Sequence, residues 1–211
     1  MARYKDAVCR LCRRATMKLY LKGQRCYTPK CSVEKRPYPP GQTGEAGTRR
    51  RRPGDYAMQL REKQKLRAIY GMLEKPFRKY VRTAERMPGV SGDILLQLLE
   101  RRLDNVVFRS GFAASRPEAR QLVAHGHLVV NGRPVDVPSY RVRTGDVVKI
   151  ADASKSIVPV LQAVASAGGR PSSTWLTVDL EARAATVNTL PLRSEINVDI
   201  NETQVMEFYS R

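Results

Sequence analysis

The 211-residue chain carries 38 Lys and Arg against 20 Asp and Glu, giving a formal net charge of +18 and a pI of about 10.2. Such an excess opposes folding by self-repulsion unless a polyanion neutralises it, so a nucleic-acid partner is expected and a basic membrane-surface protein is the weaker alternative. No apolar run reaches the ~20 residues that span a bilayer, and the start, MARYKDAVCR, lacks the apolar stretch of a signal peptide, so we expect a cytoplasmic protein without a membrane partner.

The charge is concentrated near the start of the chain. Residues 1–54 carry a net charge of +12, whereas residues 151–211 carry −2. The N-terminal half therefore supplies most of the attraction to a polyanion.

All four cysteines lie between residues 9 and 31, in the segment CRLCRRATMKLYLKGQRCYTPKC. Their spacing, C-x2-C-x13-C-x4-C, can place two close pairs of thiolates tetrahedrally around one Zn²⁺ at ~2.3 Å; the four cysteines are Cys9, Cys12, Cys26 and Cys31. We expect the first pair on a turn. An iron–sulfur cluster and free cysteines stay open as alternatives, whereas disulfides are rare in a reducing compartment. Four protein ligands leave no open position for water, so the site would be structural.

Basic residues surround the cysteines, and we expect them to lower the thiol pKa values. The same cations are candidate RNA contacts: Arg3, Lys5, Arg10, Arg13, Arg14, Lys22 and Arg25. Residues 36–54 are rich in Pro and Gly and predict an extended linker that becomes ordered against phosphates. The linker ends in four further candidate contacts, Arg49, Arg50, Arg51 and Arg52.

An apolar stripe from Leu66 to Ala84 has helical spacing. Gly71 and Pro76 interrupt it, so we expect two helices, the first capped by Asp55. Three cations of the first helix are candidate RNA contacts, namely Arg61, Lys63 and Lys65.

A leucine-rich helix is predicted from Ser91 or Asp93 to Gly111, followed by a capping box at Ser115 and a short helix ending near Gly126. Arg116 and Arg120 lie one turn apart on that short helix and are candidate contacts to structured RNA. Aromatic residues make up only 7% of the chain, which argues against a base-stacking platform.

Short strands follow at 128–130 and 147–150, with a hairpin turn at Asn131. We expect a short helix around residues 158–167, a strand within 174–180 and a last helix capped by Asn201. The pattern predicts an α+β fold.

Residues 98–150 resemble the S-four RNA-binding domain, and MARY, PPGQ, DYAMQLREKQKLRAIYG and INETQVMEFYS are similar to segments of the small-subunit ribosomal protein four family. The resemblance implies a zinc-binding N-terminal module and linker at 1–45. A helical domain at 46–92 is rejoined by about 175–211. The resemblance also implies that residues 93–174 form an S-four-type domain of two helices packed on a small antiparallel sheet.

The family resemblance also implies the function. Its members bind small-subunit ribosomal RNA directly, nucleate assembly of the subunit and contribute to translational accuracy. Implied partners are small-subunit ribosomal protein five and messenger RNA where it enters the subunit, with Arg49 and Arg50 at that channel. Some members repress their own messenger. Metal-binding members carry this cysteine spacing, which implies zinc; no small-molecule substrate and no enzymatic activity are implied.

Two other functions remain as alternatives. An RNA-modifying enzyme can borrow the same RNA-binding domain, but only 61 residues follow residue 150, and they contain no nucleotide-binding glycine loop. A zinc-containing DNA-binding regulator would need a helix-turn-helix signal that the sequence lacks.

Overall fold

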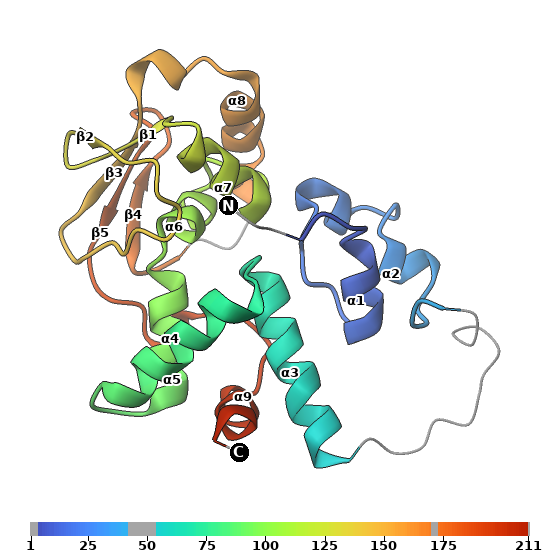
Figure 1. Cartoon of the computed structure of the whole chain (residues 1–211). Helices are drawn as coiled ribbons and strands as arrows, with labels where there is room; N and C mark the ends of the chain where they lie inside the picture. Colours follow the sequence, from blue (N-terminus) through green and yellow to red (C-terminus); the bar gives the residue numbers. More distant parts are fainter. Residues whose placement is uncertain (1–3, 42–53, 170–172, 211) are drawn as a thin grey trace. The chain divides into compact units, whose positions relative to one another are not determined.

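The computed structural model of the chain describes residues 4–41, 54–169 and 173–210 (Figure 1). Arg3 and the linker arginines Arg49 to Arg52, all predicted RNA contacts, lie outside the described residues, as does most of the predicted linker. The chain forms two compact units. The first contains residues Met1–Gly92 and Asp199–Arg211, and the second contains Asp93–Val198.

The N-terminal module, residues 4–41, contains the four cysteines on short helical segments. Cys9 is the first residue of α1 (Cys9–Ala15), and Cys12 lies three residues later on the same side of this helix. The turn predicted for this pair is therefore a helix. Cys26 lies in the 3₁₀ helix η1 (Gly23–Tyr27), and Cys31 directly precedes α2 (Ser32–Lys35). The module thus presents its cysteines from three separate segments.

Two long helices follow, as the interrupted stripe predicted: α3 (Asp55–Ile69) and α4 (Glu74–Arg86). Gly71 between them has φ +61°, a backbone conformation that favours glycine. Pro76 lies in the first turn of α4, where its missing N–H removes no intrahelical bond. The predicted cap is displaced by one residue, because Gly54 is the N-cap and Asp55 is the first helical residue.

The last helix, α9 (Glu202–Tyr209), packs against α3, although the two helices lie far apart in the sequence (Figure 1). Its predicted cap is confirmed, because Asn201 Oδ1 accepts a hydrogen bond from the Gln204 N–H at 3.2 Å. Only α9 and the residues just before it return to the first unit. The expectation that about 175–211 rejoins the helical domain is therefore wrong for residues 175–198.

In the second unit, the single helix predicted from 91 to 111 is divided into α5 (Ser91–Glu100) and α6 (Leu103–Arg109). Arg102 between them is extended, with φ −70° and ψ 137°, and forms an antiparallel bridge with Arg141. The bridge supplies hydrogen-bond partners for the backbone at the break, which in a continuous helix would bond within the helix. The capping-box helix, α7 (Arg116–Ala124), is confirmed, because the Glu118 N–H bonds to Ser115 Oγ at 3.4 Å.

A five-stranded antiparallel sheet has the strand order β2-β1-β3-β5-β4. Its strands are β1 (Leu128–Val130), β2 (Arg133–Pro134), β3 (Val147–Ile150), β4 (Leu176–Asp179) and β5 (Ala184–Val187). Asn131 and Gly132 have φ of 49° and 78°, as the predicted hairpin turn requires. The sequence did not predict β5, which pairs with both β3 and β4 and so ties residues 175–198 to this sheet.

One buried apolar cluster holds the second unit together. It joins α6 and α7 to the sheet and to α8 (Val158–Ala165), which agrees with the short helix predicted around 158–167. Trp175, 1% exposed, is among its largest fully buried side chains. Short 3₁₀ helices complete the unit: η2 (Asp152–Ser154), η3 (Ala167–Gly169) and η4 (Arg193–Glu195). The α+β class follows from this arrangement of helices on an antiparallel sheet.

Candidate nucleic-acid interface and cysteine cluster

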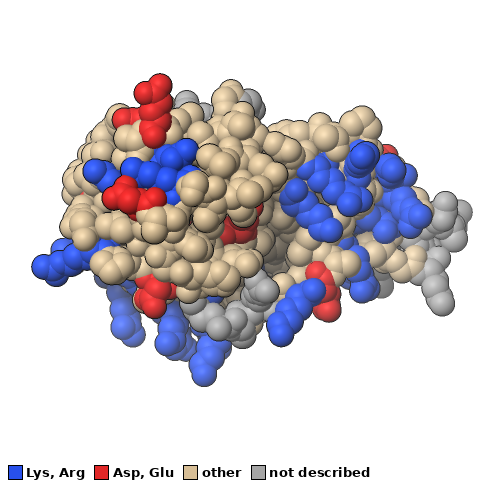
Figure 2. All heavy atoms as spheres, turned by 90° about the horizontal axis from the view of Figure 1, so that it is seen from above, with Lys and Arg blue, Asp and Glu red and all other residues tan. Residues whose placement is uncertain are grey.

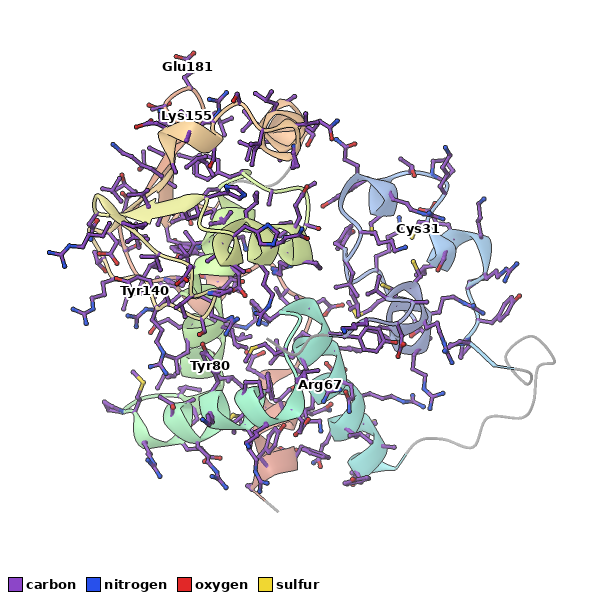
Figure 3. The ribbon with its side chains drawn as sticks, turned by 45° about the horizontal axis from the view of Figure 1, so that its top comes forward. Cys31, Arg67, Tyr80, Tyr140, Lys155 and Glu181 are labelled. Atoms are coloured by element: carbon purple, nitrogen blue, oxygen red, sulfur yellow. The ribbon has the colours of Figure 1, made fainter. Side chains whose placement is uncertain are left out.

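Three of the four cysteines form much of the interior of the N-terminal module. Cys12, Cys26 and Cys31 are 6%, 7% and 8% exposed, and the other buried apolar residues described in the module are Leu19 and Leu21. Figure 3 labels Cys31 and shows further sulfur atoms beside it. So small an apolar interior contributes little hydrophobic stabilisation.

The buried thiols affect one another. Burial raises the pKa of Cys12 above its ordinary value; a backbone hydrogen bond with Leu19 opposes this, and the thiols of Cys26, Cys9 and Cys31 raise the pKa further. Burial likewise raises the pKa of Cys26, although the Lys22 N–H donates a hydrogen bond to its Sγ at 3.4 Å. The net pKa of both thiols is thus raised, against the expectation, because burial is the largest effect; the charge of Lys18 does lower the pKa of Cys26, but only in part.

All four cysteines are free thiols. Within residues 4–41, 54–169 and 173–210, no group of three or more Cys, His, Asp and Glu side chains is arranged to hold a metal ion. The thiols therefore share one small interior without adopting a ligand geometry, and zinc stays a prediction.

Most candidate RNA contacts in the module lie on its surface. Five of them are exposed, namely Lys5, Arg10, Arg14, Lys22 and Arg25. Figure 2 shows Lys and Arg side chains gathered on the module, at the right of the view, with few acidic side chains among them. Arg13 instead supports the backbone, because its Nε donates to the Tyr38 carbonyl at 2.9 Å.

The three candidates on α3 differ in exposure. Arg61 is exposed, and Lys65 is half-buried in an ion pair with Glu62. Lys63 is only 5% exposed, because α9 covers it: its Nζ lies 4.4 Å from the Phe208 ring centroid and 3.1 Å from Glu74 Oε2. The structure therefore contradicts Lys63 as a surface contact to RNA and makes it a link between helices.

Arg116 and Arg120 also bind within the fold. Arg116 Nε donates to Asn105 Oδ1 at 2.8 Å, and its guanidinium lies over the Phe108 ring. Arg120 Nη1 donates to Asp104 Oδ2 at 3.0 Å. Both arginines therefore connect α7 to α6, which is a packing role that the one-turn spacing alone did not indicate.

A cationic surface that the sequence reading missed lies on α4. This helix buries Phe77, Tyr80, Val81 and Ala84 and exposes five cations, namely Lys75, Arg78, Lys79, Arg82 and Arg86. In the described part of the chain none of the five forms an ion pair. Their spacing of three and four residues places them opposite the apolar stripe, so the stripe itself could have revealed them.

No helix in the described part of the chain is both long and apolar enough to cross a bilayer.

Comparison with known proteins matches two families. Residues 3–100 match the ribosomal protein S4/S9 N-terminal domain, and residues 101–148 match the S4 domain. Small ribosomal subunit protein uS4 of Thermus thermophilus is 54% identical over 211 residues, covering 100% of both chains. The uS4 proteins of Pelotomaculum thermopropionicum and Desulfitobacterium hafniense are 52% and 54% identical over the same full length of both chains. Because this similarity extends over the full length of both proteins, the chain belongs to the uS4 family of small ribosomal subunit proteins.

Proposed function

We propose that this chain is a structural, non-catalytic protein of the small ribosomal subunit that binds ribosomal RNA directly. The observation that carries the proposal is the full-length similarity to uS4 proteins. A net charge of +18 supports it independently, because a polyanion offsets the self-repulsion that so many cations create. Binding places the protein on the ribosome, where it nucleates assembly of the small subunit.

The proposed RNA interface combines two cationic surfaces. One is the set of exposed cations on the N-terminal module, and the other is the solvent face of α4. Cations outnumber the exposed aromatic side chains of the module, which are Tyr4, Tyr20 and Tyr27, so phosphate contacts and RNA shape dominate recognition in this proposal.

A binding competition tests the proposal. The purified protein is titrated with labelled small-subunit ribosomal RNA, and unlabelled ribosomal RNA or duplex DNA of equal phosphate content is then added. We expect ribosomal RNA to compete far better than DNA. Equal competition would support the alternative of a DNA-binding regulator, and absence of binding at moderate salt would exclude the proposed function.

We further propose that the N-terminal module binds one Zn²⁺ through Cys9, Cys12, Cys26 and Cys31. Three of these thiols are buried together in an interior with few other apolar residues. A bound ion would supply folding free energy that the small core lacks. An iron–sulfur cluster would use the same four ligands, so the metal must be identified directly.

Metal analysis tests this proposal without RNA. Wild-type protein purified without chelators should contain about one zinc per chain, and Cys9→Ser should lose it while Ser32→Ala keeps it. Proteolysis should then cut residues 1–35 of Cys9→Ser faster and leave the second unit intact. Metal-free wild-type protein that resists proteolysis equally well would contradict the zinc site; iron with visible absorbance would replace zinc with a cluster.

The remaining proposed partners are small-subunit ribosomal protein five and messenger RNA where it enters the subunit. These proposals rest on the family resemblance and on the linker arginines Arg49 and Arg50, where loss of both charges should impair unwinding of structured messengers. Crosslinking in assembled subunits should recover protein five, and translation of a hairpin-bearing messenger should slow with Arg49→Ala/Arg50→Ala. An unchanged rate on hairpin and unstructured messengers would contradict the role of the arginines.

A further inference from the structure

Asn131 and Gly132 are the only Asn-Gly pair in the sequence, and they form the turn between β1 and β2. Such a pair is chemically labile, because glycine has no side chain to keep its backbone nitrogen away from the asparagine amide carbon. Both residues are exposed, so water has access to the turn. The lability of the pair in the folded protein therefore depends on what holds the Asn131 side chain.

Asn131 is bonded to a neighbouring strand by its backbone and by its side chain. Its backbone N–H donates to the Val147 carbonyl at 3.0 Å, and its Oδ1 accepts a hydrogen bond from the Val147 N–H at 2.8 Å. Both backbone groups of Val147, the first residue of β3, thus bond to Asn131. These bonds continue the pairing of β1 with β3 beyond the end of β1 (Figure 1).

The amide nitrogen of Asn131 has a buried, charged partner. Its Nδ2 donates to Asp146 Oδ1 at 2.8 Å, and Asp146 is 8% exposed. The carboxylate is itself fixed, because Oδ2 accepts a hydrogen bond from the Arg143 backbone N–H at 2.7 Å. The amide nitrogen is therefore held by a charge-assisted hydrogen bond, which is stronger than a neutral one.

These bonds oppose the side-chain movement that a reaction with Gly132 requires. The amide carbon Cγ of Asn131 must turn toward the Gly132 nitrogen, and this movement breaks the hydrogen bonds of both Oδ1 and Nδ2. The buried Asp146 carboxylate would then lose one of its donors, which costs free energy. The folded state thus disfavours the reactive orientation of the amide.

We propose that Asn131 is a deamidation site and that Asp146 suppresses its reaction in the folded protein. When the side chain is released, the Gly132 nitrogen bonds to Asn131 Cγ, the Cγ–Nδ2 bond breaks, and the proton of the Gly132 N–H leaves with Nδ2 as ammonia. The product is a cyclic succinimide. Water then opens the ring: cleavage between Cγ and the Gly132 nitrogen gives aspartate, and cleavage of the original peptide bond gives isoaspartate.

Neither product can keep the contacts of the native turn. Aspartate brings a second carboxylate to Asp146, where it repels instead of donating. Isoaspartate adds a methylene to the main chain of a tight turn whose φ angles are 49° and 78°. Deamidation should therefore loosen the pairing of β1 with β3. The inference goes beyond the proposed function, because it concerns a modification of the chain and does not depend on RNA.

Mass spectrometry of the tryptic peptide 121–141 tests the proposal on wild-type protein. Asn131 is the only asparagine in this peptide, so fragmentation can locate the replacement of its NH₂ by OH. At mildly alkaline pH, the folded protein should deamidate roughly tenfold or more slowly than the protein unfolded in urea, because a hydrogen bond to a charged group must first break. Equal rates in the two states would overturn the proposal.

Variants at Asp146 test its part in the protection. Folded Asp146→Ala should deamidate faster than wild-type protein, and Asp146→Asn, which keeps a neutral acceptor, should have an intermediate rate. Asp179→Ala is the matched control, because it removes another carboxylate from the same sheet, one that accepts from the Ala182 N–H. Fluorescence of the buried Trp175 reports whether each variant is folded. A folded Asp146 variant with the wild-type rate would overturn the role of Asp146.

An exchange of the two side chains gives a second test, which remains available if Asp146→Ala does not fold. Asn131→Asp copies one product and should lower the urea midpoint, because two carboxylates then meet. Asn131→Asp/Asp146→Asn restores one amide donor facing one carboxylate and should recover much of the loss. Absence of any recovery would overturn the pairing of these two side chains as the source of protection.

Discussion

At the scale of single residues, the least expected side chain is Glu100, which is fully buried. Its Oε1 accepts a hydrogen bond from Arg109 Nη2 at 2.8 Å, and its Oε2 accepts from Arg109 Nε at 3.0 Å and from Asn105 Nδ2 at 2.7 Å. The carboxylate therefore joins the end of α5 to α6 across the break between them. Burial of this charge is tolerated because the guanidinium is bidentate.

Replacing Glu100 should destabilise the second unit strongly. Glu100→Gln leaves the Arg109 guanidinium, whose side chain is 12% exposed, without its counter-charge, so we expect a loss of about 3–5 kcal/mol. Trp175 is the only tryptophan and is buried in the same unit, so its fluorescence during urea unfolding reports the change. Glu85→Gln on the exposed side of α4 is the control, with an expected change within about 0.5 kcal/mol. Equal midpoints for the two variants would contradict the role of Glu100.

Residue types could be predicted better than residue partners. Glu100, Asp104 and Glu118 are visible in the sequence as acids near the arginines, but the sequence does not show which acid pairs with which arginine. Arg120 reaches Asp104 across 16 residues because α6 and α7 pack together, and that distance is set by the fold. Lys63 was misread for the same reason: the side chains that cover it lie on α9, at the other end of the chain.

At the scale of elements, the docking of α9 is held by polar contacts as well as apolar ones. Tyr209 Oη donates to Glu74 Oε1 at 2.6 Å, and Gln59 Nε2 donates to Glu207 Oε2 at 2.9 Å. Burial raises the pKa of Glu74, but hydrogen bonds from Tyr209 and Lys63 and the charges of Lys63 and Arg67 outweigh it and leave the pKa below its ordinary value. Burial and the same hydrogen bond raise the pKa of Tyr209.

The docking of α9 should therefore weaken at both extremes of pH. A carboxyl whose pKa is lowered by folding stabilises the folded state at any pH above its pKa in the unfolded chain. The stability that Glu74 contributes should therefore be lost as pH falls below about 4.3. A phenol whose pKa is raised by folding stabilises the folded state at any pH below its pKa in the unfolded chain. The stability that Tyr209 contributes should therefore be lost as pH rises above about 10. Hydrogen exchange of α9 amides measures both limits. Tyr209→Phe should abolish the alkaline loss, and an unchanged alkaline limit in this variant would contradict the assignment.

Elements with a regular pattern were predictable, and those defined by partners were not. Periodicity and caps identified α3, α4, α7 and α9, and the Asn131 turn located the first hairpin. The strand β5, with sequence AATV, is short and rich in alanine, so it lacks the alternation that marks a strand. The break between α5 and α6 carries no Gly or Pro; it exists because Arg102 pairs with Arg141.

At the scale of the whole molecule, charge and stability are distributed differently. The second unit contains a large apolar cluster, whereas the N-terminal module has a small interior made largely of thiols and carries many exposed cations. The part of the chain with the greatest attraction for RNA is thus the part with the least hydrophobic stabilisation. RNA and a bound metal would both favour its folded state, because any ligand that binds only the folded state stabilises it.

Binding to RNA should consequently depend steeply on salt. If the cations of the module and of α4 neutralise six to ten phosphates, affinity for ribosomal RNA should fall by about 10³–10⁵ between 50 and 200 mM salt. Arg78→Gln/Arg82→Gln/Arg86→Gln removes three charges from the exposed face of α4 without touching its buried side, so the log–log slope should become shallower by about 3. Filter-binding titrations at four or more salt concentrations give both slopes, and Arg133→Gln/Lys149→Gln/Lys155→Gln removes the same charge from the second unit as a control.

If both triple variants reduced the slope equally, net charge alone would govern binding and α4 would have no special place in the interface. A flat profile for wild-type protein would contradict a phosphate-dominated interface altogether.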